Sequence, residues 1–312
     1  MEKTPFHILE SQQFSRTFLE NFFSVAKEME GIIHSGKTSD ILKNKRMIPL
    51  FYEPSTRTRL SFEMAMSHLG GQVFSTENAK ESSSAVKGET IEDTMRVVAA
   101  YRPDVIVVRH YEDGIVHKAA KVSPVPIINA GDGKNQHPTQ ALIDLYTIKE
   151  KFGGIDGISI AMVGDLASYR SVRSLCCALA KFNNIKIYFV SPATHTIKDD
   201  IKEYISSHGI YFEESQDLRK VAPLVDIIYQ TRIQKERGMN FDNKDMSLGY
   251  FLVNKEILGL MKKEAIVMHP LPRIDEISPE VDADPRAYYF KQAENGLYTR
   301  MGLLKMMLGP EV

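Results

Sequence analysis

Short apolar runs rich in β-branched residues recur along this chain, and longer segments with helical spacing lie between them. The runs predict strands over Met47–Tyr52, Val105–Arg109, Val125–Asn129, Ile158–Val163, Ile185–Val190, Ile227–Gln230 and Ala265–Met268. The segments between them predict helices that include Ser15–Ile33, Thr56–Leu69, Pro138–Lys151, Ser171–Lys181 and Asp199–Ser206. Continuous apolar strands that alternate with helices indicate an α/β protein with doubly wound parallel sheets, each covered on both faces.

The segment 152–157 (FGGIDG) predicts a junction between two domains. Its three glycines end the preceding helix and precede a new series of strands and helices. We therefore expect one domain over residues 1–150 and another over 151–290. The last helical segment, Gln292–Leu308, has its apolar positions on one face, and this pattern fits packing on either domain.

The polar stretch Ser75–Asp93 predicts a long surface loop, because it contains many serines and few large apolar residues. Long loops inside compact domains are often functional lids. We therefore keep its lysine and serines as candidates for a binding site.

Composition and charge narrow the class of partner and the compartment. The 39 Lys and Arg balance 40 Asp and Glu, so nothing in the net charge of −1 indicates nucleic acid or an anionic membrane as a partner. The two cysteines, Cys176 and Cys177, are adjacent, which excludes a disulfide framework and favours a reducing compartment. The N-terminus lacks the layout of a signal peptide, and no apolar run approaches the roughly 20 residues that span a bilayer. We expect a cytoplasmic protein, with removal of an upstream transit peptide left open.

The strongest chemical motif is the segment 51–59 (FYEPSTRTR). A strand ends there, and Ser55 and Thr56 are suited to cap the helix that follows. A helix N-terminus offers free N–H groups and a positive dipole end, and hydroxyls and arginines alternate through this one. These groups predict a site for a phosphate dianion.

A second motif, 135–140 (NQHPTQ), follows a predicted strand and a glycine-rich turn. Pro138 suits the first turn of a helix, so His137 and Gln140 should lie at the carboxyl edge of a parallel sheet, where α/β folds bind ligands. His137 is then a candidate electrophile that donates a hydrogen bond to a polarised carbonyl oxygen.

Two further motifs follow predicted strands in the second half of the chain. In 231–237 (TRIQKER), Arg232 and Gln234 should point to the same side of an extended segment, which suits a carboxylate ligand. Arg170 is a second candidate ligand of this kind. In 268–273 (MHPLPR), two prolines flank Leu271 in a stiff loop whose carbonyl groups could accept hydrogen bonds from an NH2 group.

In this order and spacing, the motifs FYEPSTRT, HPTQ and HPLPR resemble the aspartate/ornithine carbamoyltransferase superfamily from about Phe51 to Leu308. TRIQKER and HPLPRIDEI are similar to the aspartate branch. Ornithine enzymes carry a cysteine where this chain has Pro270, and they carry an SMG sequence that this chain lacks. The stretch TENAKESSSAVKGETIEDT also resembles the mobile loop of the family.

The resemblance implies transfer of the carbamoyl group of carbamoyl phosphate to L-aspartate, an early step of pyrimidine biosynthesis. It implies a carbamoyl-phosphate domain over 1–150, an aspartate domain over 151–290 and a terminal helix over 291–312 that returns to the first domain. It also implies a homotrimer whose active sites are shared between subunits, with neither a metal nor an organic cofactor. Whether a regulatory chain binds, or a nucleotide inhibits, is left open.

The resemblance also assigns roles by position in the motifs. The carbamoyl-phosphate ligands would be Ser55, Thr56, Arg57, Thr58, Ser83, Arg109, His137, Gln140, Pro270, Leu271 and Pro272. The aspartate ligands would be Lys87, Arg170, Arg232, Gln234 and Leu271. The residues that carry catalysis would be Arg57, Thr58, Lys87, Arg109, His137 and Gln140. Ser83 and Lys87 would reach into the site of a neighbouring subunit.

One position departs from the family pattern. The family usually has glycine immediately before the arginine that corresponds to Arg170, and this chain has Tyr169. We therefore expect a change in affinity for aspartate, not in the class of reaction. The alternatives are a transcarbamoylase for another amino acid and a binding protein without turnover. A nucleotide-dependent dehydrogenase fits less well, because the passage GDLASY lacks the G-x-G-x-x-G spacing.

Overall fold

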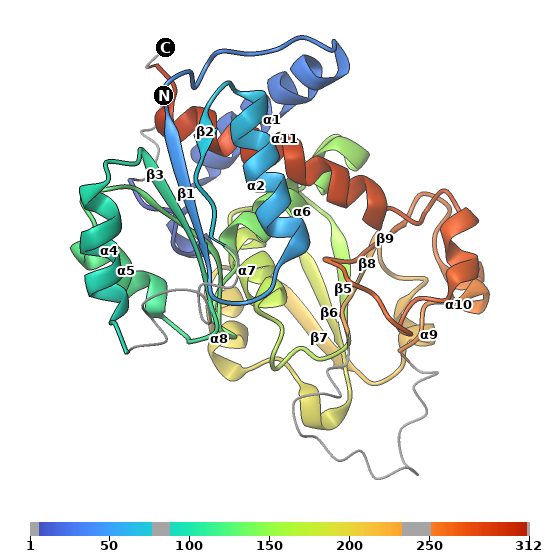
Figure 1. Ribbon diagram of the computed structural model, residues 1–312. Coiled ribbons are helices and arrows are strands. Elements are labelled where there is room, and N and C mark those ends of the chain that lie inside the picture. The colour runs from blue at the N-terminus through green and yellow to red at the C-terminus, as the bar shows by residue number, and fades with distance from the viewer. Residues whose placement is uncertain (1–5, 77–87, 233–250, 311–312) are drawn as a thin grey trace. The chain divides into compact units, whose positions relative to one another are not determined.

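The computed structural model describes residues 6–76, 88–232 and 251–310, which form two compact units (Figure 1). Unit 1 comprises Met1–Lys149 and Glu294–Val312, and unit 2 comprises Glu150–Ala293. Each unit contains one sheet whose strands are all parallel, with helices in the connections. The two-unit α/β architecture predicted from the sequence is confirmed.

The sheet of unit 1 has the strand order β2-β1-β3-β4. Its strands are β1 (Arg46–Phe51), β2 (Gln72–Val73), β3 (Val105–His110) and β4 (Ile127–Asp132), and its connecting helices are α2 (Thr56–His68), α4 (Ile91–Ala100) and α5 (Ile115–Val122). The chain leaves β1 in one direction and later returns to place β3 on its other side. The carboxyl ends of β1 and β3 therefore form a topological switch point, where open α/β sheets bind ligands.

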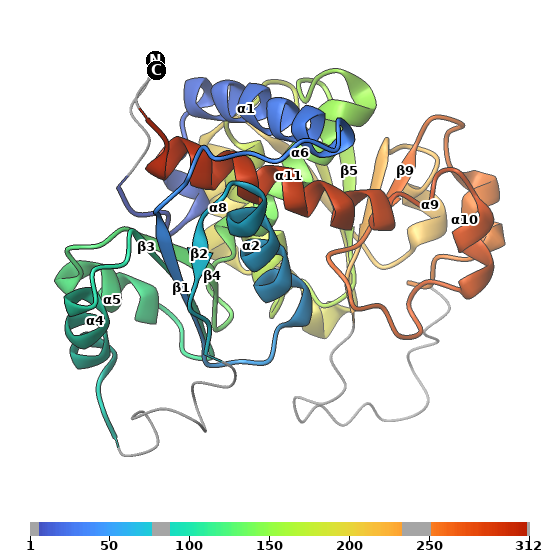
Figure 2. The ribbon, with the colours of Figure 1, turned by 45° about the horizontal axis from the view of Figure 1, so that its top comes forward.

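Two further helices pack against each other in unit 1 (Figure 2). They are α1 (Arg16–His34) and the second half of α11 (Tyr289–Leu308), and Gly302 lets their backbones approach closely. A Cβ atom on Gly302 would lie 3.2 Å from Cα of Ala26. Lys305 Nζ also pairs with Glu28 Oε2 at 2.6 Å. The helix α6 (Pro138–Phe152) begins in unit 1, and the short 3₁₀ helix Ser11–Gln13 precedes α1.

The sheet of unit 2 has the order β7-β6-β5-β8-β9, with its switch point between β5 and β8. Its strands are β5 (Ser159–Val163), β6 (Lys186–Val190), β7 (Tyr211–Ser215), β8 (Ile227–Gln230) and β9 (Ile266–Met268), and its helices are α7 (Arg170–Leu179), α8 (Asp199–Ser207), α9 (Leu218–Val221) and α10 (Lys255–Leu260). Two 3₁₀ helices, Ala193–His195 and Pro279–Ala283, complete it.

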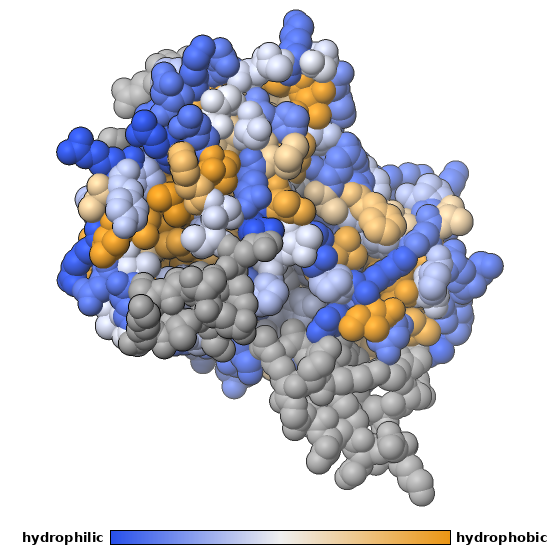
Figure 3. All heavy atoms as spheres, in the orientation of Figure 1, coloured by the Kyte–Doolittle hydropathy of each residue, from blue (hydrophilic) through white to orange (hydrophobic). Residues whose placement is uncertain are grey.

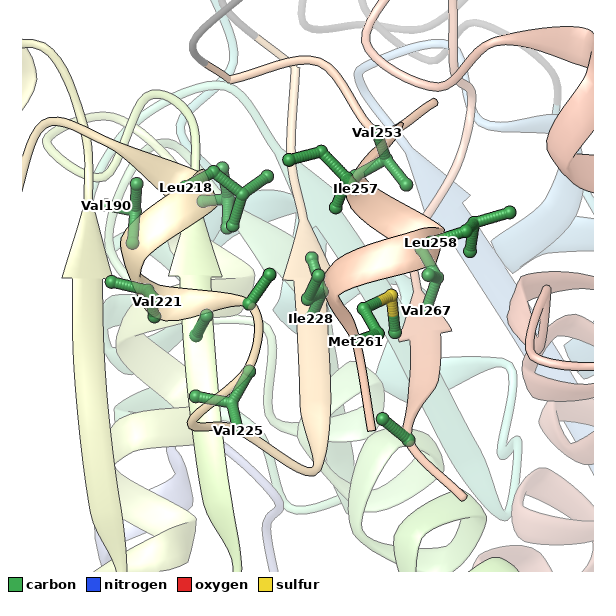
Figure 4. Close-up of a cluster of buried hydrophobic side chains, with 14 of the residues drawn as sticks. Val190, Leu218, Val221, Val225, Ile228, Val253, Ile257, Leu258, Met261 and Val267 are labelled. Atoms are coloured by element: carbon green, nitrogen blue, oxygen red, sulfur yellow. The ribbon is translucent and has the colours of Figure 1, made fainter. Parts of the chain in front are cut away.

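The core of unit 2 on one face of this sheet lies under α9 and α10 (Figure 4). Leu218 and Val221 from α9 and Ile257 from α10 pack with Ile228 of β8 and Val267 of β9. Burial of such side chains contributes about 1.5–3 kcal/mol each. This packing holds the ends of β8 and β9 in place below their loops.

Several element boundaries differ from the sequence prediction. The expected loop over 75–93 ends earlier, because α4 begins at Ile91 and buries Ile91 and Met95 against the sheet. The strand β4 extends to Asp132, beyond the predicted end at Asn129. The strands β2 and β7 were not predicted, because β2 has two residues and the edge strand β7 has no fully buried position. In the part of the chain that the structure describes, no helix is both long and apolar enough to cross a membrane.

Candidate active site

In unit 1, three candidate segments follow neighbouring strands of the sheet. Phe51 pairs in register with Arg109, and Tyr52 N–H donates to the Arg109 carbonyl at 2.8 Å. The Arg109 guanidinium lies 3.4 Å from the Glu53 carboxylate (Nε to Oε2) and donates from Nη1 to the Ala130 carbonyl of β4 at 3.3 Å. Arg109 thus bridges the ends of β1 and β4, and Glu53 is a contact that the motif did not identify.

The N-terminus of α2 lies just beyond this point. Ser55 occupies the N-cap position, but its side chain makes no capping hydrogen bond, which corrects the role expected for it. By contrast, the Ser15 hydroxyl at the start of α1 accepts from Phe18 N–H at 3.0 Å. The Ser55 side chain therefore does not cap the first turn of α2, and the N–H groups at a helix N-terminus are suited to bind an anion. Arg57 is exposed on this turn, and Thr58 is 7% exposed.

His137 stands between the end of β4 and the start of α6, and a buried carboxylate organises the turn before it. Asp132 Oδ1 accepts from Asn129 Nδ2 at 2.9 Å and from Gln136 N–H at 3.1 Å. Its Oδ2 accepts from Gly114 N–H at 2.9 Å and Asn135 Nδ2 at 3.1 Å. These bonds fix the approach to His137, which is 6% exposed. The sequence did not identify this role of Asp132. Three of its partners are local, but its contact with Gly114, 18 residues earlier, forms only in the folded sheet.

Gln140 lies in the first turn of α6, as predicted. Its Nε2 donates to Asp144 Oδ1 at 2.8 Å, one helical turn further on. Asp144 has no exposed surface and was not identified from the sequence. Most of α6 is buried on every face, so its sequence has no polar stripe. The sequence pattern therefore does not show whether a polar residue of this helix is buried or exposed.

In unit 2, the loops after β5 and β8 approach each other closely. Asp165 N–H donates to the Arg232 carbonyl at 3.4 Å, and Thr231 N–H and Oγ1 both donate to the Val163 carbonyl at 2.8 Å. Gly164 has φ +118°, and a Cβ there would lie 2.4 Å from the Thr231 carbonyl oxygen. The close approach therefore requires glycine, and it places Arg232 near the start of α7.

Tyr169 and Arg170 lie at the start of α7, which begins one residue before the predicted boundary. Burial raises the pKa of the Tyr169 phenol, while the charge of Arg232 and a hydrogen bond from the Arg232 backbone act to lower it. The Tyr169 side chain therefore reaches across to the loop that carries Arg232. This arrangement brings the predicted arginines of two loops to one switch point.

The third loop of unit 2 follows β9 and contains Pro270, Leu271 and Pro272. Leu271 has φ +54°, a left-handed conformation, and its N–H donates to His269 Nδ1 at 2.7 Å. Glu276 Oε2 accepts from Ile274 N–H at 3.1 Å, while its Oε1 contacts His269 Nε2 at 2.7 Å. Burial acts to raise the pKa of Glu276, but the hydrogen bond and charge of His269 hold it below its ordinary value.

Three predicted site residues, Ser83, Lys87 and Gln234, lie outside the described residues. The other predicted residues lie at or after the carboxyl ends of the strands of their own unit, at β1, β3 and β4 in unit 1 and after β5, β8 and β9 in unit 2. Among the described residues, no group of three or more His, Cys, Asp or Glu side chains is arranged to hold a metal ion.

Two family models, one for each substrate-binding domain, together match most of this chain. Residues 7–150 match the carbamoyl-phosphate-binding domain of aspartate/ornithine carbamoyltransferases, and residues 156–307 match the Asp/Orn-binding domain. The chain belongs to the aspartate/ornithine carbamoyltransferase family. The resemblance inferred from the motifs is confirmed.

Individual members of this family are similar over nearly the whole chain. The chloroplastic aspartate carbamoyltransferase of Arabidopsis thaliana is 58% identical over 96% of this chain and 77% of its own length. The catalytic subunit of Thermoplasma acidophilum is 47% identical over 93% of this chain and 94% of its own. The Trypanosoma cruzi aspartate transcarbamoylase in complex with N-(phosphonacetyl)-L-aspartic acid is 38% identical, with a TM-score of 0.90 over 97% of this chain and 96% of its own.

Proposed function

We propose that this enzyme transfers the carbamoyl group of carbamoyl phosphate to the amine of L-aspartate, giving N-carbamoyl-L-aspartate and phosphate. The observation that carries the proposal is the placement of the N-terminus of α2, Arg109, His137 and Gln140 after the neighbouring strands β1, β3 and β4, at the carboxyl edge of the sheet of unit 1. Relatives named aspartate carbamoyltransferase, and a related structure in complex with N-(phosphonacetyl)-L-aspartic acid, support the choice of acceptor. The reaction is an early step of pyrimidine biosynthesis.

The phosphate group of the substrate accepts hydrogen bonds at the N-terminus of α2, where Ser55, Thr56 and Thr58 add hydroxyls and Arg57 adds positive charge. Arg109, Thr58 and His137 donate to the carbamoyl oxygen. Gln140 Oε1 accepts from the carbamoyl NH2, together with the carbonyls of the loop that contains Pro270, Leu271 and Pro272. Hydrogen-bond donors that are oriented toward the oxygen on which negative charge develops are usually the largest source of transition-state stabilisation.

The acceptor site uses the loops of unit 2. Arg170 and Arg232 bind the two carboxylates of aspartate, with Gln234, Lys87 and the Leu271 carbonyl as further ligands. The neutral amine attacks the carbamoyl carbon, and negative charge develops on the carbamoyl oxygen. A C–N bond forms, the C–O bond to phosphate breaks, and the leaving phosphate accepts the amine proton. Holding both substrates in one site converts an encounter in solution into a unimolecular step.

We also propose a cytoplasmic homotrimer in which Ser83 and Lys87 serve the site of a neighbouring subunit. Exposed apolar side chains on α2, on α4 and just after β2 support self-association. The members of this set are Leu60, Met64, Phe74, Val97 and Tyr101. Figure 3 shows apolar surface on this side of unit 1. Plant relatives are named chloroplastic, so cell fractionation with an antibody against the chain tests the compartment.

Carbamoyl transfer to L-aspartate and to L-ornithine, measured side by side with purified protein, tests the reaction. Turnover with aspartate alone is the expected result, and turnover with ornithine instead would overturn the acceptor assignment. Mixing two inactive variants, Lys87→Ala and His137→Ala, after reversible dissociation tests the shared site. Recovered activity is expected, because some hybrid sites then contain both native residues. No recovery, with trimers present by native mass spectrometry, would contradict sharing.

A further inference from the structure

A buried polar network lies behind Gln140 in unit 1. Gln140 Nε2 donates to Asp144 Oδ1 at 2.8 Å, and Asp144 is completely buried. An ionised carboxylate can only accept hydrogen bonds, so the Gln140 amide must present its NH2 group to Asp144. Its carbonyl oxygen is thereby left for another partner, and no donor among the described residues bonds to it.

A buried arginine supplies the compensating charge. Arg300 of α11 is 4% exposed, its guanidinium carbon lies 4.9 Å from the centre of the Phe62 ring, and its Nη1 donates to the Gly296 carbonyl at 3.2 Å. Burial lowers the pKa of Arg300 to about 9, while the charge of Asp144 acts to raise it. Arg300 therefore remains a cation at pH 7 and stabilises the negative charge of Asp144.

The local sequence leaves room for this cation. Gly296 lies one turn before Arg300 in α11, and a Cβ on Gly296 would lie 2.9 Å from Arg300 Nη1. Phe62, whose ring faces the guanidinium, belongs to α2, the helix whose start is the phosphate site. The cation thus packs among the helices that carry the substrate-binding residues, and an unpaired charge there would be costly.

We propose that Asp144 is a positioning residue that orients the Gln140 amide, so that the site selects an acyl phosphate bearing NH2 over one bearing a methyl group. This inference rests on the proposed function, because it assigns the Gln140 oxygen to the carbamoyl NH2. With its oxygen outward, Gln140 accepts from the NH2 of carbamoyl phosphate. With its amide turned over, Gln140 would present its own NH2 group to the NH2 group of the substrate, and two donors form no hydrogen bond.

The test is Asp144→Asn, assayed with carbamoyl phosphate and with acetyl phosphate, in which a methyl group replaces NH2. The new amide is the same size and can donate to Gln140, which permits the Gln140 amide to turn over. We expect kcat/KM for carbamoyl phosphate to fall about tenfold or more, as loss of one hydrogen bond to a buried group predicts. The value for acetyl phosphate should change by less than about twofold. A parallel fall for both substrates would show a merely structural role and overturn the proposal.

A second variant separates orientation from stability. In the double variant Gln140→Glu with Asp144→Asn, position 140 presents an acceptor whichever way it turns, and the new amide donates to it. Discrimination between the two acyl phosphates should recover at least partly. If the ratio stays as low as in the single variant, orientation of Gln140 by Asp144 is not the cause.

The matched control is Thr147→Val on the same helix. Thr147 is also buried, donates to the Ile143 carbonyl at 2.8 Å and accepts from Asn295 Nδ2 at 3.0 Å, without contacting Gln140. Its loss should lower thermal stability while leaving the ratio of the two kcat/KM values unchanged. A ratio that falls as far as in Asp144→Asn would overturn the proposal.

Binding distinguishes this inference from the proposed function. Thermal stabilisation by carbamoyl phosphate and by acetyl phosphate is measured for the wild type and for Asp144→Asn, and it requires no turnover. If the wild type transfers nothing to aspartate, the proposed function fails, and the binding ratio still tests the role of Asp144. If the wild type is active but the variant keeps the wild-type ratio, only this inference fails.

Discussion

The imidazole of His269 and the carboxylate of Glu276 meet at 2.7 Å, from Nε2 to Oε1, with both side chains almost wholly buried. His269 Nδ1 accepts the Leu271 N–H, so the ring proton lies on Nε2 and is donated to Glu276. Glu276 thus selects the histidine tautomer that can hold Leu271 in its left-handed conformation. Through this pair, a buried carboxylate determines where the Leu271 carbonyl points.

The variant Glu276→Gln should weaken both the fold and the substrate-binding loop. Loss of a charged, buried hydrogen bond predicts a fall of about 1.5–3 kcal/mol in the free energy of unfolding. Because the Leu271 carbonyl then shifts, KM for carbamoyl phosphate should rise about threefold to tenfold. Urea unfolding and steady-state kinetics measure the two effects. Glu280→Gln, which alters an exposed carboxylate paired with Lys255, is the control and should change neither.

The free energy of unfolding should decrease at acidic pH, because the carboxyl groups of Glu276 and Asp226 have lowered pKa values in the folded protein. Burial acts to raise the pKa of Asp226, but hydrogen bonds from Lys262 and Ser159 bring it below its ordinary value of 3.8. The pKa of Glu276 is likewise below 4.5. The unfolded chain therefore binds more protons at low pH, so stability is complete above about pH 5 and is lost as pH falls through the folded pKa values. Thermal unfolding between pH 7 and pH 3 should show this, with a shallower decline in Glu276→Gln. Parallel curves would contradict the assignment.

Removal of the Tyr169 hydroxyl should affect the acceptor. In Tyr169→Phe the hydrogen bond with the Arg232 backbone is lost while the ring remains, so the loop that carries Arg232 is held less firmly. We expect KM for aspartate to rise about threefold to tenfold, with KM for carbamoyl phosphate unchanged, since one neutral hydrogen bond contributes about 0.5–1.5 kcal/mol. Tyr211→Phe removes a phenol hydroxyl on the exposed edge strand and is the matched control. An equal rise in KM for aspartate in Tyr211→Phe would show that Tyr169 has no specific role in the acceptor site.

The variant His137→Ala should lose rate much more than phosphate affinity. His137 donates to the oxygen on which charge develops, and removal of one such donor lowers kcat by about 10²–10³. The helix start at Thr56 keeps the phosphate ligands, so binding of inorganic phosphate, measured by calorimetry, should change little. His208→Ala, at an exposed position at the end of α8, should leave both quantities unchanged. A large loss of phosphate affinity in His137→Ala would place this residue at the phosphate instead.

Two glycines in helices of unit 1 should respond to alanine in opposite ways. In Gly302→Ala the new methyl group meets the backbone of Ala26 at 3.2 Å, and backbone atoms cannot move aside, so about 1–2 kcal/mol of stability should be lost. In Gly31→Ala nothing lies within 4 Å, so the higher helix propensity of alanine should add about 0.5–1 kcal/mol. Urea unfolding of both variants measures the difference. Equal effects would contradict the close packing of α1 and α11.

Most strands and helices of this fold could be predicted from the local pattern of apolar and polar residues. The apolar strands and the helices between them were predicted with boundaries mostly within two residues, because strands buried on both faces are apolar throughout. Short and exposed elements were not readable, since β7 lies at an edge and is half polar. The helix α4 begins inside a polar stretch because only two of its residues, Ile91 and Met95, are fully buried.

Some residues of the candidate site could likewise be placed from the sequence, and others could not. Arg109 lies at the end of a strand, and His137, Arg170 and Arg232 follow strands in sequence. Because parallel strands bring their carboxyl ends to one edge, the pattern of strands alone places these residues at the carboxyl edges of the two sheets. Ser55 lies at the N-cap position, as expected, but the capping hydrogen bond expected of its side chain is absent, because residue type alone does not determine the geometry of that bond.

The supporting carboxylates follow from three-dimensional packing. Asp132 and Asp144 lie in none of the quoted motifs, and Glu276 lies in HPLPRIDEI without a role assigned to it. The burial of all three depends on helices and loops that fold over them. Asp144 acts with Arg300, which is far away in sequence, and this pairing arises only when α11 packs in unit 1. The order of residues and the period of the hydrophobic positions are local properties, so the sequence by itself determines the strands, the helices and the loops that carry the motifs. The burial and charge balance that orient a functional side chain are properties of the folded unit.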